Sequence, residues 1–262
     1  MNLSQKVAII TGATAGIGRA TAVSFAQAGA IVVATGRRQE RLDALLAALP
    51  AGPHLAVAGD IQNLDFPAAL VAQTTATLGR IDVLVNNAGV GQQHPLADIP
   101  RQAVETVFQT NVLGLLQMAQ AVIPQMRQQG GGHIVNVSSI VGQRPLPGGV
   151  VYAASKTAVN FLSRGLRFEL KQNNIRVTTV YPGLTATEFA DVRLGQQGAN
   201  RFGLRGIPAE RVGKAIVRAV ENGRSECYIT PFDWLFVHLN RLFPRTLDAL
   251  LAQMTYWDKS TK

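Results

Sequence analysis

Short apolar runs rich in β-branched residues alternate with longer segments of helical composition along most of the chain. Such alternation favours an α/β fold, because strands joined through a helix pair in parallel by a right-handed crossover. We therefore expect a single doubly wound parallel sheet of about seven strands with helices on both faces. The expected strands are Val7–Ile10, Ile31–Ala34, Leu55–Ala58, Val83–Val85, Ile134–Val137, Val177–Val180 and Tyr228–Thr230. The expected helices include Ile17–Ala28, Leu42–Leu49, Ala103–Met126 and Val151–Leu170.

The size of the chain fits one such sheet. With 262 residues, 47% of them hydrophobic, it can bury the core of a single domain. Cys227 is the only cysteine, so no disulfide can form within the chain, and a reducing compartment such as the cytoplasm is expected. The sequence shows no secretory signal and no uncharged apolar stretch of about 18 residues, so we expect no membrane-spanning segment.

The net charge of +9 is compatible with nucleic-acid binding, with an anionic membrane surface or with an anionic cofactor. The basic residues are spread along the chain and are not interleaved with aromatic residues as in a nucleic-acid-binding motif. We therefore expect no nucleic-acid partner. The four histidines have no cysteine or carboxylate at metal-ligand spacing, so no metal site is expected.

The first motif with chemical meaning is a glycine cluster, Thr11-Gly12-Ala13-Thr14-Ala15-Gly16-Ile17-Gly18, between the first strand and the first helix. Glycines allow positive φ and let the backbone approach a pyrophosphate, whose charge is favoured at a helix N-terminus. The spacing is Gly-x3-Gly-x-Gly, which differs from the usual dinucleotide fingerprint. The same cluster could also form a plain strand–helix turn, so its meaning depends on the motifs that follow.

The end of the second strand carries arginines where an NAD-binding chain carries an acid. Thr35-Gly36 is followed by Arg37 and Arg38, and no Asp or Glu stands there to bind a ribose 2′-hydroxyl. Guanidinium groups can bind a 2′-phosphate through paired, charge-assisted hydrogen bonds. The pattern predicts a preference for NADP(H), set chiefly by Arg37 with support from Arg38. The alternative is that both arginines are solvated residues at the start of the next helix.

A tyrosine and a lysine stand four residues apart in Tyr152-Ala153-Ala154-Ser155-Lys156, within a predicted helix. This spacing places both side chains on one face, one turn apart. A nearby ammonium group favours the phenolate and lowers the pKa of a phenol, which allows it to act as an acid or base. Ser138 and Ser139 close a strand upstream, at the edge where α/β sheets bind ligands.

Together these motifs resemble the classical short-chain dehydrogenase/reductase family over about residues 5–230. The matching motifs, in chain order, are Thr11–Gly18, Asp60, Asn86-Asn87-Ala88-Gly89, Asn111, Ser139, Tyr152/Lys156 and Pro182-Gly183 followed by Thr187. The resemblance implies a Rossmann-like fold, a nicotinamide dinucleotide cofactor and oxidoreductase activity at a carbonyl or secondary alcohol.

The resemblance also implies roles for four catalytic residues. Tyr152 would be the general acid/base, and Ser139, not Ser138, would polarise the substrate carbonyl. Lys156 would hold the nicotinamide ribose and lower the pKa of Tyr152. Asn111, inside a helix, would hold a water that links Lys156 to solvent.

Cofactor contacts carried over from the family fall into groups along the chain. Asp60 and Ile61 would contact the adenine. For Asp60, an N-cap role at the start of a helix is an alternative. Asn86 would be structural. The full expected set is Gly12, Thr14, Gly16, Ile17, Gly18, Arg37, Arg38, Asp60, Ile61, Asn87, Ala88, Gly89, Tyr152, Lys156, Pro182, Gly183, Thr185 and Thr187.

The end of the chain departs from the family pattern. We divide the chain into a short-chain dehydrogenase/reductase domain over 1–231 and an extension over 232–262. Within the domain, a substrate lid is expected over about 187–207, where the glycines are Gly195, Gly198, Gly203 and Gly206. In the extension Leu247, Leu250, Leu251 and Met254 follow helical spacing, so two amphipathic helices separated by Pro244 are expected. This extension could pack on the core, contact a partner subunit or touch an anionic membrane, and it resembles family members that handle lipophilic substrates.

The sequence thus predicts an NADP(H)-dependent oxidoreductase that acts on a small-molecule carbonyl or alcohol, expected to be lipophilic, and that assembles as a homodimer or homotetramer. A cofactor-binding regulator without turnover is the alternative. It would bind NADPH but oxidise it with no carbonyl.

Overall fold

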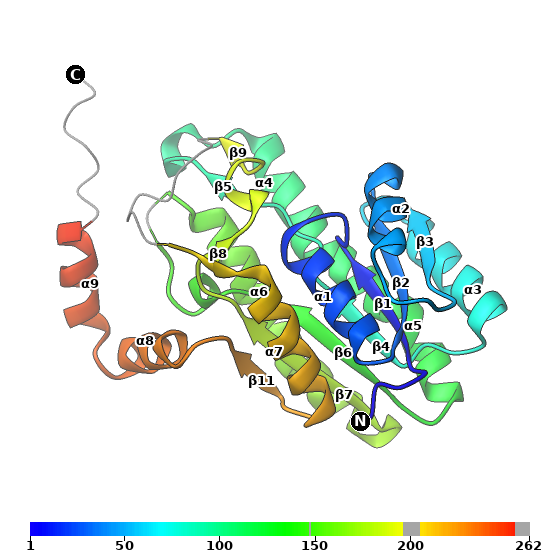
Figure 1. Cartoon of the computed structure of the whole chain (residues 1–262). Coiled ribbons are helices and arrows are strands. Elements are labelled where there is room, and N and C mark those ends of the chain that lie inside the picture. The colour runs from blue at the N-terminus through cyan, green and yellow to red at the C-terminus, as the bar shows by residue number, and fades with distance from the viewer. Residues whose placement is uncertain (147, 196–204, 255–262) are drawn as a thin grey trace.

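The computed structural model describes residues 1–146, 148–195 and 205–254, and their side chains as far as residue 249. Seven parallel strands form one sheet in the order β11-β7-β6-β4-β1-β2-β3 (Figure 1). The strands are β1 (Val7–Thr11), β2 (Ile31–Gly36), β3 (Leu55–Ala58), β4 (Val83–Asn86), β6 (Gly132–Val137), β7 (Ile175–Tyr181) and β11 (Glu226–Tyr228). The predicted α/β class and doubly wound parallel sheet are confirmed.

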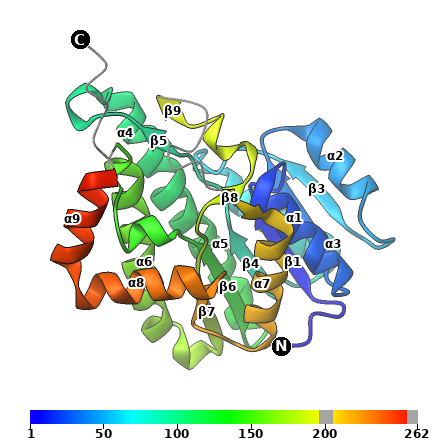
Figure 2. The ribbon, with the colours of Figure 1, turned by 60° about the vertical axis from the view of Figure 1, so that its left-hand side comes forward.

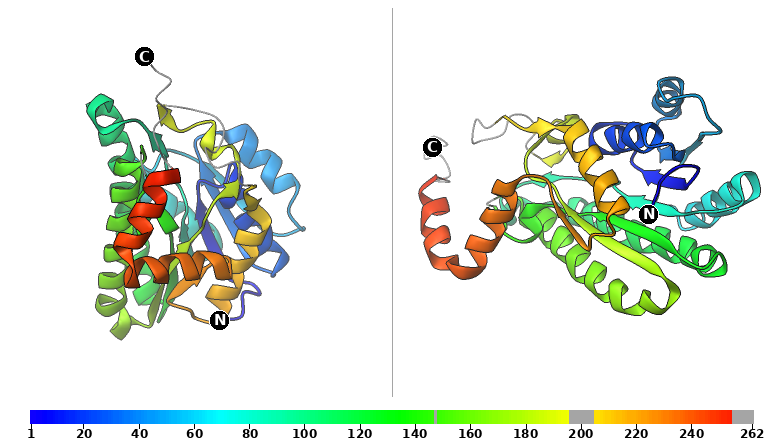
Figure 3. Two further views of the ribbon diagram at one scale, coloured as in Figure 1. Left: turned by 90° about the vertical axis from the view of Figure 1, so that its left-hand side faces the viewer. Right: turned by 60° about the horizontal axis from the view of Figure 1, so that its bottom comes forward.

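Helices cover both faces of this sheet, as the two views of Figure 3 show. The helices of the main domain are α1 (Gly16–Gln27), α2 (Gln39–Ala47), α3 (Phe66–Leu78), α4 (Arg101–Phe108), α5 (Leu115–Gln128), α6 (Val150–Glu169) and α7 (Ala209–Glu221). Strand order reverses between β1 and β4, and ligands of open α/β sheets bind at the carboxyl edge beside such a reversal.

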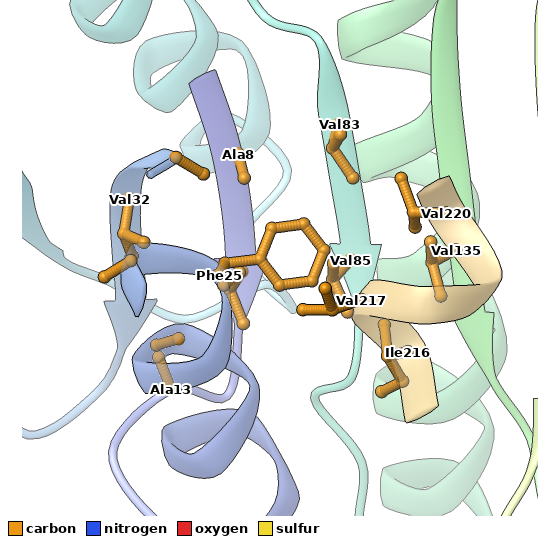
Figure 4. Close-up of a cluster of buried hydrophobic side chains, with 14 of the residues drawn as sticks. Ala8, Ala13, Phe25, Val32, Val83, Val85, Val135, Ile216, Val217 and Val220 are labelled. Atoms are coloured by element: carbon orange, nitrogen blue, oxygen red, sulfur yellow. The ribbon is translucent and has the colours of Figure 1, made fainter. Parts of the chain in front are cut away.

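The central strands bury alternate residues in two separate cores. On one face, Ala8 and Val32 lie with Phe25 of α1 and Val217 of α7, and the Phe25 ring points between these elements (Figure 4). On the other face, Ile9 packs with side chains from α3 and α5. Strands buried on both sides consist almost entirely of apolar residues, which is why their positions could be predicted from short apolar runs.

Several element boundaries differ from the sequence prediction by a few residues, and two of the differences have an identifiable cause. The long helix expected over Ala103–Met126 is interrupted by a π-helical turn, η2 (Gln109–Gly114), between α4 and α5. The last strand ends at Tyr228, because Thr230 instead caps the next helix. The apolar spacing that predicted both segments carries no information about a π turn or about the choice of cap.

The expected C-terminal extension forms two helices, α8 (Pro231–Leu242) and α9 (Pro244–Met254). Thr230 and Asp233 form a reciprocal capping box that begins α8, and Pro244 begins α9. Asn240 Nδ2 donates to the Gln143 carbonyl oxygen at 3.4 Å, and Arg144 is paired with Asp248, so both helices contact the loop before α6 (Figure 2). The side chains of Leu250, Leu251 and Met254 and the whole of 255–262 lie outside the described residues.

The expected lid is described in part. It contains the 3-10 turn η5 (Glu188–Ala190) and β9 (Leu194–Gly195), and β10 (Ile207–Pro208), where it ends, pairs with β8 (Thr185–Ala186), which lies just before it. β9 pairs with β5 (Gln92–Gln93). Gly198 and Gly203 lie outside the described residues. Within the described part of the chain, no helix has the length and apolar character needed to cross a membrane.

Candidate active site

The ends of β1 and β4 are joined by a threonine hydroxyl. Thr11 Oγ1 accepts the backbone N–H groups of Asn87 and Ala88, each at 3.0 Å. The Asn87 side chain returns a bond from Nδ2 to the Thr11 carbonyl oxygen at 3.0 Å. These bonds hold the glycine loop and the Asn87–Gly89 segment together at the strand-order reversal.

The glycine loop requires its glycines. Gly12 and Gly16 have φ of 66° and 51°, a region that favours glycine. A Cβ on Gly18 would lie 2.2 Å from the Gly12 carbonyl oxygen, so α1 can begin against the loop only without a side chain there. Ile17 is partly buried on the core below.

A cleft of about 430 Å³ opens in front of this loop. Its lining includes Thr14, Gly16, Arg19, Arg41 and Glu188. Glycine backbone at a helix N-terminus, with cations at the same opening, fits a dinucleotide diphosphate. The residues present therefore suit the cofactor that the sequence predicts.

Three arginines lie beside the cleft, at and after the end of β2. Arg38 donates to Thr14 Oγ1 at 2.9 Å. Arg38 and Arg41 each form an ion pair with Glu188. The Arg37 side chain is 71% exposed, and its guanidinium lies 3.9 Å from Asp60. The two arginines selected from the sequence therefore differ: Arg38 reaches the glycine loop, whereas Arg37 lies towards Asp60.

Asp60 does not cap a helix. Its Oδ1 accepts the backbone N–H of Gln62 at 3.0 Å, in a local turn, and α3 begins later, at Phe66. Ile61 is buried and packs against Gly114 of the π turn. The N-cap alternative is therefore wrong, and adenine contact by Asp60 stays a prediction.

The two adjacent serines point to different partners. Ser138 Oγ is buried and bonds Asn160 Oδ1 at 2.6 Å and the Lys156 carbonyl oxygen at 3.1 Å. Ser139 Oγ lies at the N-terminus of the 3-10 turn η3 (Ile140–Gly142) and donates to the Pro182 carbonyl oxygen at 3.3 Å, and its interaction with the Tyr152 phenol lowers the pKa of that phenol. The Ser139 hydroxyl is thus the one placed beside the tyrosine.

Tyr152 and Lys156 lie one turn apart on α6. The Lys156 ammonium donates to the Val137 carbonyl oxygen at 2.8 Å and lies 5.8 Å from the Tyr152 ring centroid. Burial raises the pKa of Tyr152, and the neighbouring Ser139 hydroxyl lowers it by less. Burial also lowers the pKa of Lys156 to about 8. In this structure desolvation, and not the ammonium, therefore dominates the phenol pKa, in contrast to our expectation from the spacing.

Asn111 lies in the π turn, behind Lys156. Its Oδ1 accepts the Val90 N–H at 2.7 Å, and its Nδ2 donates to the Val90 carbonyl oxygen and to Ser155 Oγ, each at 3.0 Å. A Cβ on Gly89 would lie 3.2 Å from Asn111 Oδ1 and 3.5 Å from Lys156 Nζ. Asn111, Gly89 and Lys156 are therefore neighbours.

The remaining predicted residues follow β7. Pro182 accepts from Ser139, and Thr185 Oγ1 donates to the Gly183 carbonyl oxygen at 3.1 Å. Thr187 begins η5, and a Cβ on Gly16 would lie 3.0 Å from its methyl group. The described structure therefore brings the predicted residues to one edge of the sheet.

Three neighbours of the site were absent from the predicted set. Arg41 follows Arg38 by one helical turn, a spacing that could have identified it. Glu188 and Phe189 come from the segment expected to form the lid, and Phe189 packs on the Tyr152 ring with centroids 5.6 Å apart. No local pattern marks these two, because their partners lie far away in sequence.

The family follows from comparison with known proteins. A family model for short chain dehydrogenases matches residues 6–197. The chain belongs to the short-chain dehydrogenase family. This short-chain dehydrogenase is 39% identical over 253 residues to the oxidoreductase asL5 of Sarocladium schorii, across 96% of this chain and 98% of asL5. It is 41% identical over 190 residues to the NADP-dependent 3-hydroxy acid dehydrogenase YdfG of Shigella flexneri, across 71% and 76% of the two chains.

Solved structures agree with the assignment. A short-chain dehydrogenase/reductase of Burkholderia phymatum in complex with NAD matches with a TM-score of 0.83 at 27% identity, over 94% of this chain and 96% of that one. A short-chain dehydrogenase of Burkholderia cenocepacia in complex with NADP matches with a TM-score of 0.82 at 28% identity, over 96% and 99%. This short-chain dehydrogenase is therefore an oxidoreductase of a family that uses NAD or NADP.

Proposed function

We propose that this short-chain dehydrogenase transfers a hydride between NADP(H) and a carbonyl or secondary alcohol, with Tyr152 as general acid/base. The observation that carries the proposal is the placement of Lys156 one turn from Tyr152 on α6, with its ammonium 5.8 Å from the centre of the phenol ring, and of Ser139 at the carboxyl edge of the sheet after β6. A hydroxyl donor and a proton source that converge on one point suit a carbonyl oxygen that becomes an alcohol.

In the direction of reduction, a bound nicotinamide would supply a hydride to the carbonyl carbon. Ser139 donates a hydrogen bond to the carbonyl oxygen, and Tyr152 gives that oxygen its proton. The raised pKa of Tyr152 keeps the phenol protonated at neutral pH, which suits proton donation. Lys156 would bind the nicotinamide ribose, and a water held at Asn111 would return the proton from solvent; both roles stay predictions.

The preference for NADP(H) is supported by the basic residues beside the cleft. Arg38 already donates to Thr14 in the glycine loop, and Arg37 stands where an NAD-binding chain would carry an acid. Gly36 is a poor position for an engineered acid, because its Cβ would lie 2.8 Å from Thr14 Cγ2. The test is therefore Arg37→Ser and Arg38→Ser, singly and together.

We expect kcat/KM for NADPH to fall by about tenfold or more in the double variant, and kcat/KM for NADH to stay within a few fold. Equal kcat/KM for NADPH and NADH in the unmodified protein would contradict the proposed preference.

For the substrate we propose a lipophilic carbonyl or alcohol. Leu184, Phe189 and Val192 are exposed apolar residues of the lid region, and Phe189 lies against Tyr152. A specific observation favours a second class, 3-hydroxy acids such as the relative YdfG is named for. Arg144, close after Ser139 in the same loop, has a side chain only 13% exposed, and its Nε has no hydrogen-bond partner among the described residues.

An NADPH-oxidation screen separates these classes. Its panel contains steroid, retinoid and long-chain ketones, small aldehydes and 3-keto acids. Turnover of the lipophilic members supports the first class, and turnover of the acids that is lost in Arg144→Met supports the second. NADPH binding without oxidation by any member would favour a cofactor-binding regulator.

We also propose a cytoplasmic protein that forms a homodimer or homotetramer. Phe161 and Phe168 of α6 are 68% and 81% exposed and lie two turns apart, an apolar surface suited to a second copy. Light scattering after size exclusion tests the assembly: a monomer would contradict it.

The exposed apolar residues of α8 and its C-terminal end suit an anionic membrane surface. Phe232, Leu242 and Phe243 are exposed there, and Arg241 and Arg245 lie among them. Apolar side chains flanked by cations favour peripheral contact with anionic lipids.

A further inference from the structure

The carboxylate of Glu188, in the lid, is held between two arginines of the cofactor cleft. Arg38 Nη2 lies 2.9 Å from Glu188 Oε1, and Arg41 Nη1 lies 3.0 and 2.9 Å from the two carboxylate oxygens. The hydrogen bonds from Arg41 and then Arg38 lower the pKa of this carboxyl group, so it is charged at neutral pH. Two guanidinium groups that converge on one anion form an arrangement that also suits a phosphate.

This ion pair lies in the cofactor cleft itself. The guanidinium of Arg38 that contacts Glu188 also donates to Thr14 of the glycine loop at 2.9 Å. Glu188 and Arg41 line the cleft together with Thr14 and Gly16. An anion that enters between the loop and the end of β2 therefore meets arginines that already have a partner.

The same turn of the lid also covers the candidate catalytic tyrosine. η5 begins at Thr187, whose hydroxyl accepts the Phe189 N–H at 3.3 Å. Phe189, the residue after Glu188, packs on the Tyr152 ring at a centroid distance of 5.6 Å. A single short turn thus contacts the arginines with one side chain and the Tyr152 ring with the next.

We propose that Glu188 competes with the 2′-phosphate of NADP(H) for Arg38 and Arg41, and that its displacement releases the turn that carries Phe189 from Tyr152. The inference rests on the proposed use of NADP(H). NADH has no 2′-phosphate and leaves the Glu188 pairs in place. Glu188 is therefore a residue that tunes cofactor discrimination and links it to the opening of the site.

The test measures binding of 2′,5′-ADP and 5′-ADP by calorimetry, without substrate. Glu188→Gln keeps the shape of the side chain and removes its charge. We expect it to bind 2′,5′-ADP about tenfold more tightly than the unmodified protein, the gain that loss of two exposed ion pairs allows. Binding of 5′-ADP should change by less than about twofold.

Glu210→Gln is the matched control. Glu210 lines the same cleft and carries the same charge, but no ion pair joins it to either arginine within the described residues. An equal gain in this variant would show a general charge effect and would overturn the proposal.

Hydrogen exchange tests release of the turn directly. In the unmodified protein, 2′,5′-ADP should speed amide exchange over residues 188–190, and 5′-ADP should not; in Glu188→Gln exchange should be fast without ligand. Slower or unchanged exchange with 2′,5′-ADP would overturn the release step.

The two proposals fail in different ways. If the unmodified protein binds 2′,5′-ADP no better than 5′-ADP, the NADP(H) preference is wrong, and this inference falls with it. If 2′,5′-ADP is preferred but Glu188→Gln binds it equally or less tightly, only the competition by Glu188 is overturned.

Discussion

The Lys156 ammonium donates to the carbonyl oxygen of Val137, the residue that ends β6. The amine is almost fully buried, and this burial lowers its pKa to about 8. Loss of its proton above that pH would remove a charge from the point where we expect the nicotinamide ribose. The side chain therefore links cofactor affinity to pH.

We predict that NADPH affinity falls as pH rises through about 8. The deprotonated lysine binds the nicotinamide ribose less well than the ammonium does. If only the ammonium form binds, the affinity for NADPH at pH 9 is about tenfold lower than at neutral pH. Calorimetric titration between pH 6.5 and 9.5 measures the effect. Lys156→Met should bind more weakly and show a flat profile, and a transition that persists in this variant would assign the titration to another group.

Replacement of Tyr152 by Phe should abolish turnover and leave NADPH binding within a few fold. Phe keeps the ring, which packs on Phe189, and removes the proton donor, so kcat should fall by about 100-fold or more. Tyr228→Phe is the control, since the Tyr228 hydroxyl has no hydrogen-bond partner among the described residues. A Tyr152→Phe variant that kept a tenth of the kcat would show that another group transfers the proton.

Much of the fold could be predicted because its signals are local. The β-branched runs mark strands buried on both faces, and the glycines mark a loop whose backbone approaches itself closely, as between Gly12 and Gly18. The motif order then placed the predicted site residues at the ends of particular strands. Each of these inferences uses residues close together in sequence.

The parts that could not be predicted depend on contacts between distant residues. The pairs of Glu188 with Arg38 and Arg41 join positions 150 and 147 residues apart. The bond from Lys156 to the Val137 carbonyl depends on how α6 lies against β6, which spacing within α6 does not contain. Burial of Tyr152 likewise comes from the tertiary fold, and it reverses the direction of the pKa shift that a neighbouring lysine suggests.

Gly18→Ala should abolish NADPH binding. The new methyl group would lie 2.2 Å from the Gly12 carbonyl oxygen, so the loop would have to move from the start of α1. Gly165→Ala on α6 is the matched control, because nothing lies within 4 Å of its added methyl group. We expect this control to bind NADPH normally and to gain about 0.5–1 kcal/mol of stability, as alanine favours a helix interior. Normal NADPH binding by Gly18→Ala would show that the loop does not hold the diphosphate.

Stability should fall as pH drops from about 6.5 to about 4, owing to His133. This side chain is fully buried, its Nε2 lies 2.7 Å from Thr178 Oγ1, and burial lowers its pKa to about 4. Below pH 6.5 the unfolded chain binds a proton that the folded chain excludes, so the free energy of unfolding decreases, by about 3 kcal/mol in total. Urea denaturation at pH 7, 5.5 and 4.5 measures the slope.

His133→Gln should flatten this slope, because glutamine does not titrate. The pKa of the buried Asp82 carboxyl is lowered from its ordinary value of 3.8. The stability that this carboxylate contributes is therefore lost mainly below pH 3.8, outside the pH range of the His133 effect. An unchanged slope in the glutamine variant would place the acid sensitivity elsewhere.

The last prediction concerns the exposed apolar residues of α8 and its C-terminal end. One face of α8 is fixed to the domain: Val237 is fully buried, and a Cβ on Gly183 would lie 2.3 Å from Asp233 Oδ1. Removal of the whole extension would therefore disturb the turn after β7, and substitution of exposed residues is the cleaner test.

Phe232, Leu242 and Phe243 are 70%, 70% and 57% exposed, and we expect their joint replacement by Ser to abolish co-sedimentation with vesicles rich in phosphatidylserine. Each nearby cation adds about 1 kcal/mol at an anionic surface, so vesicles of phosphatidylcholine alone should bind weakly. The control replaces Leu64 and Leu96, which are apolar, 76% and 73% exposed and lie outside α8 and α9, and should bind like the unmodified protein. If the unmodified protein ignores anionic vesicles, and the triple variant instead changes the oligomeric state, the exposed residues of α8 contact another subunit and the membrane proposal is wrong.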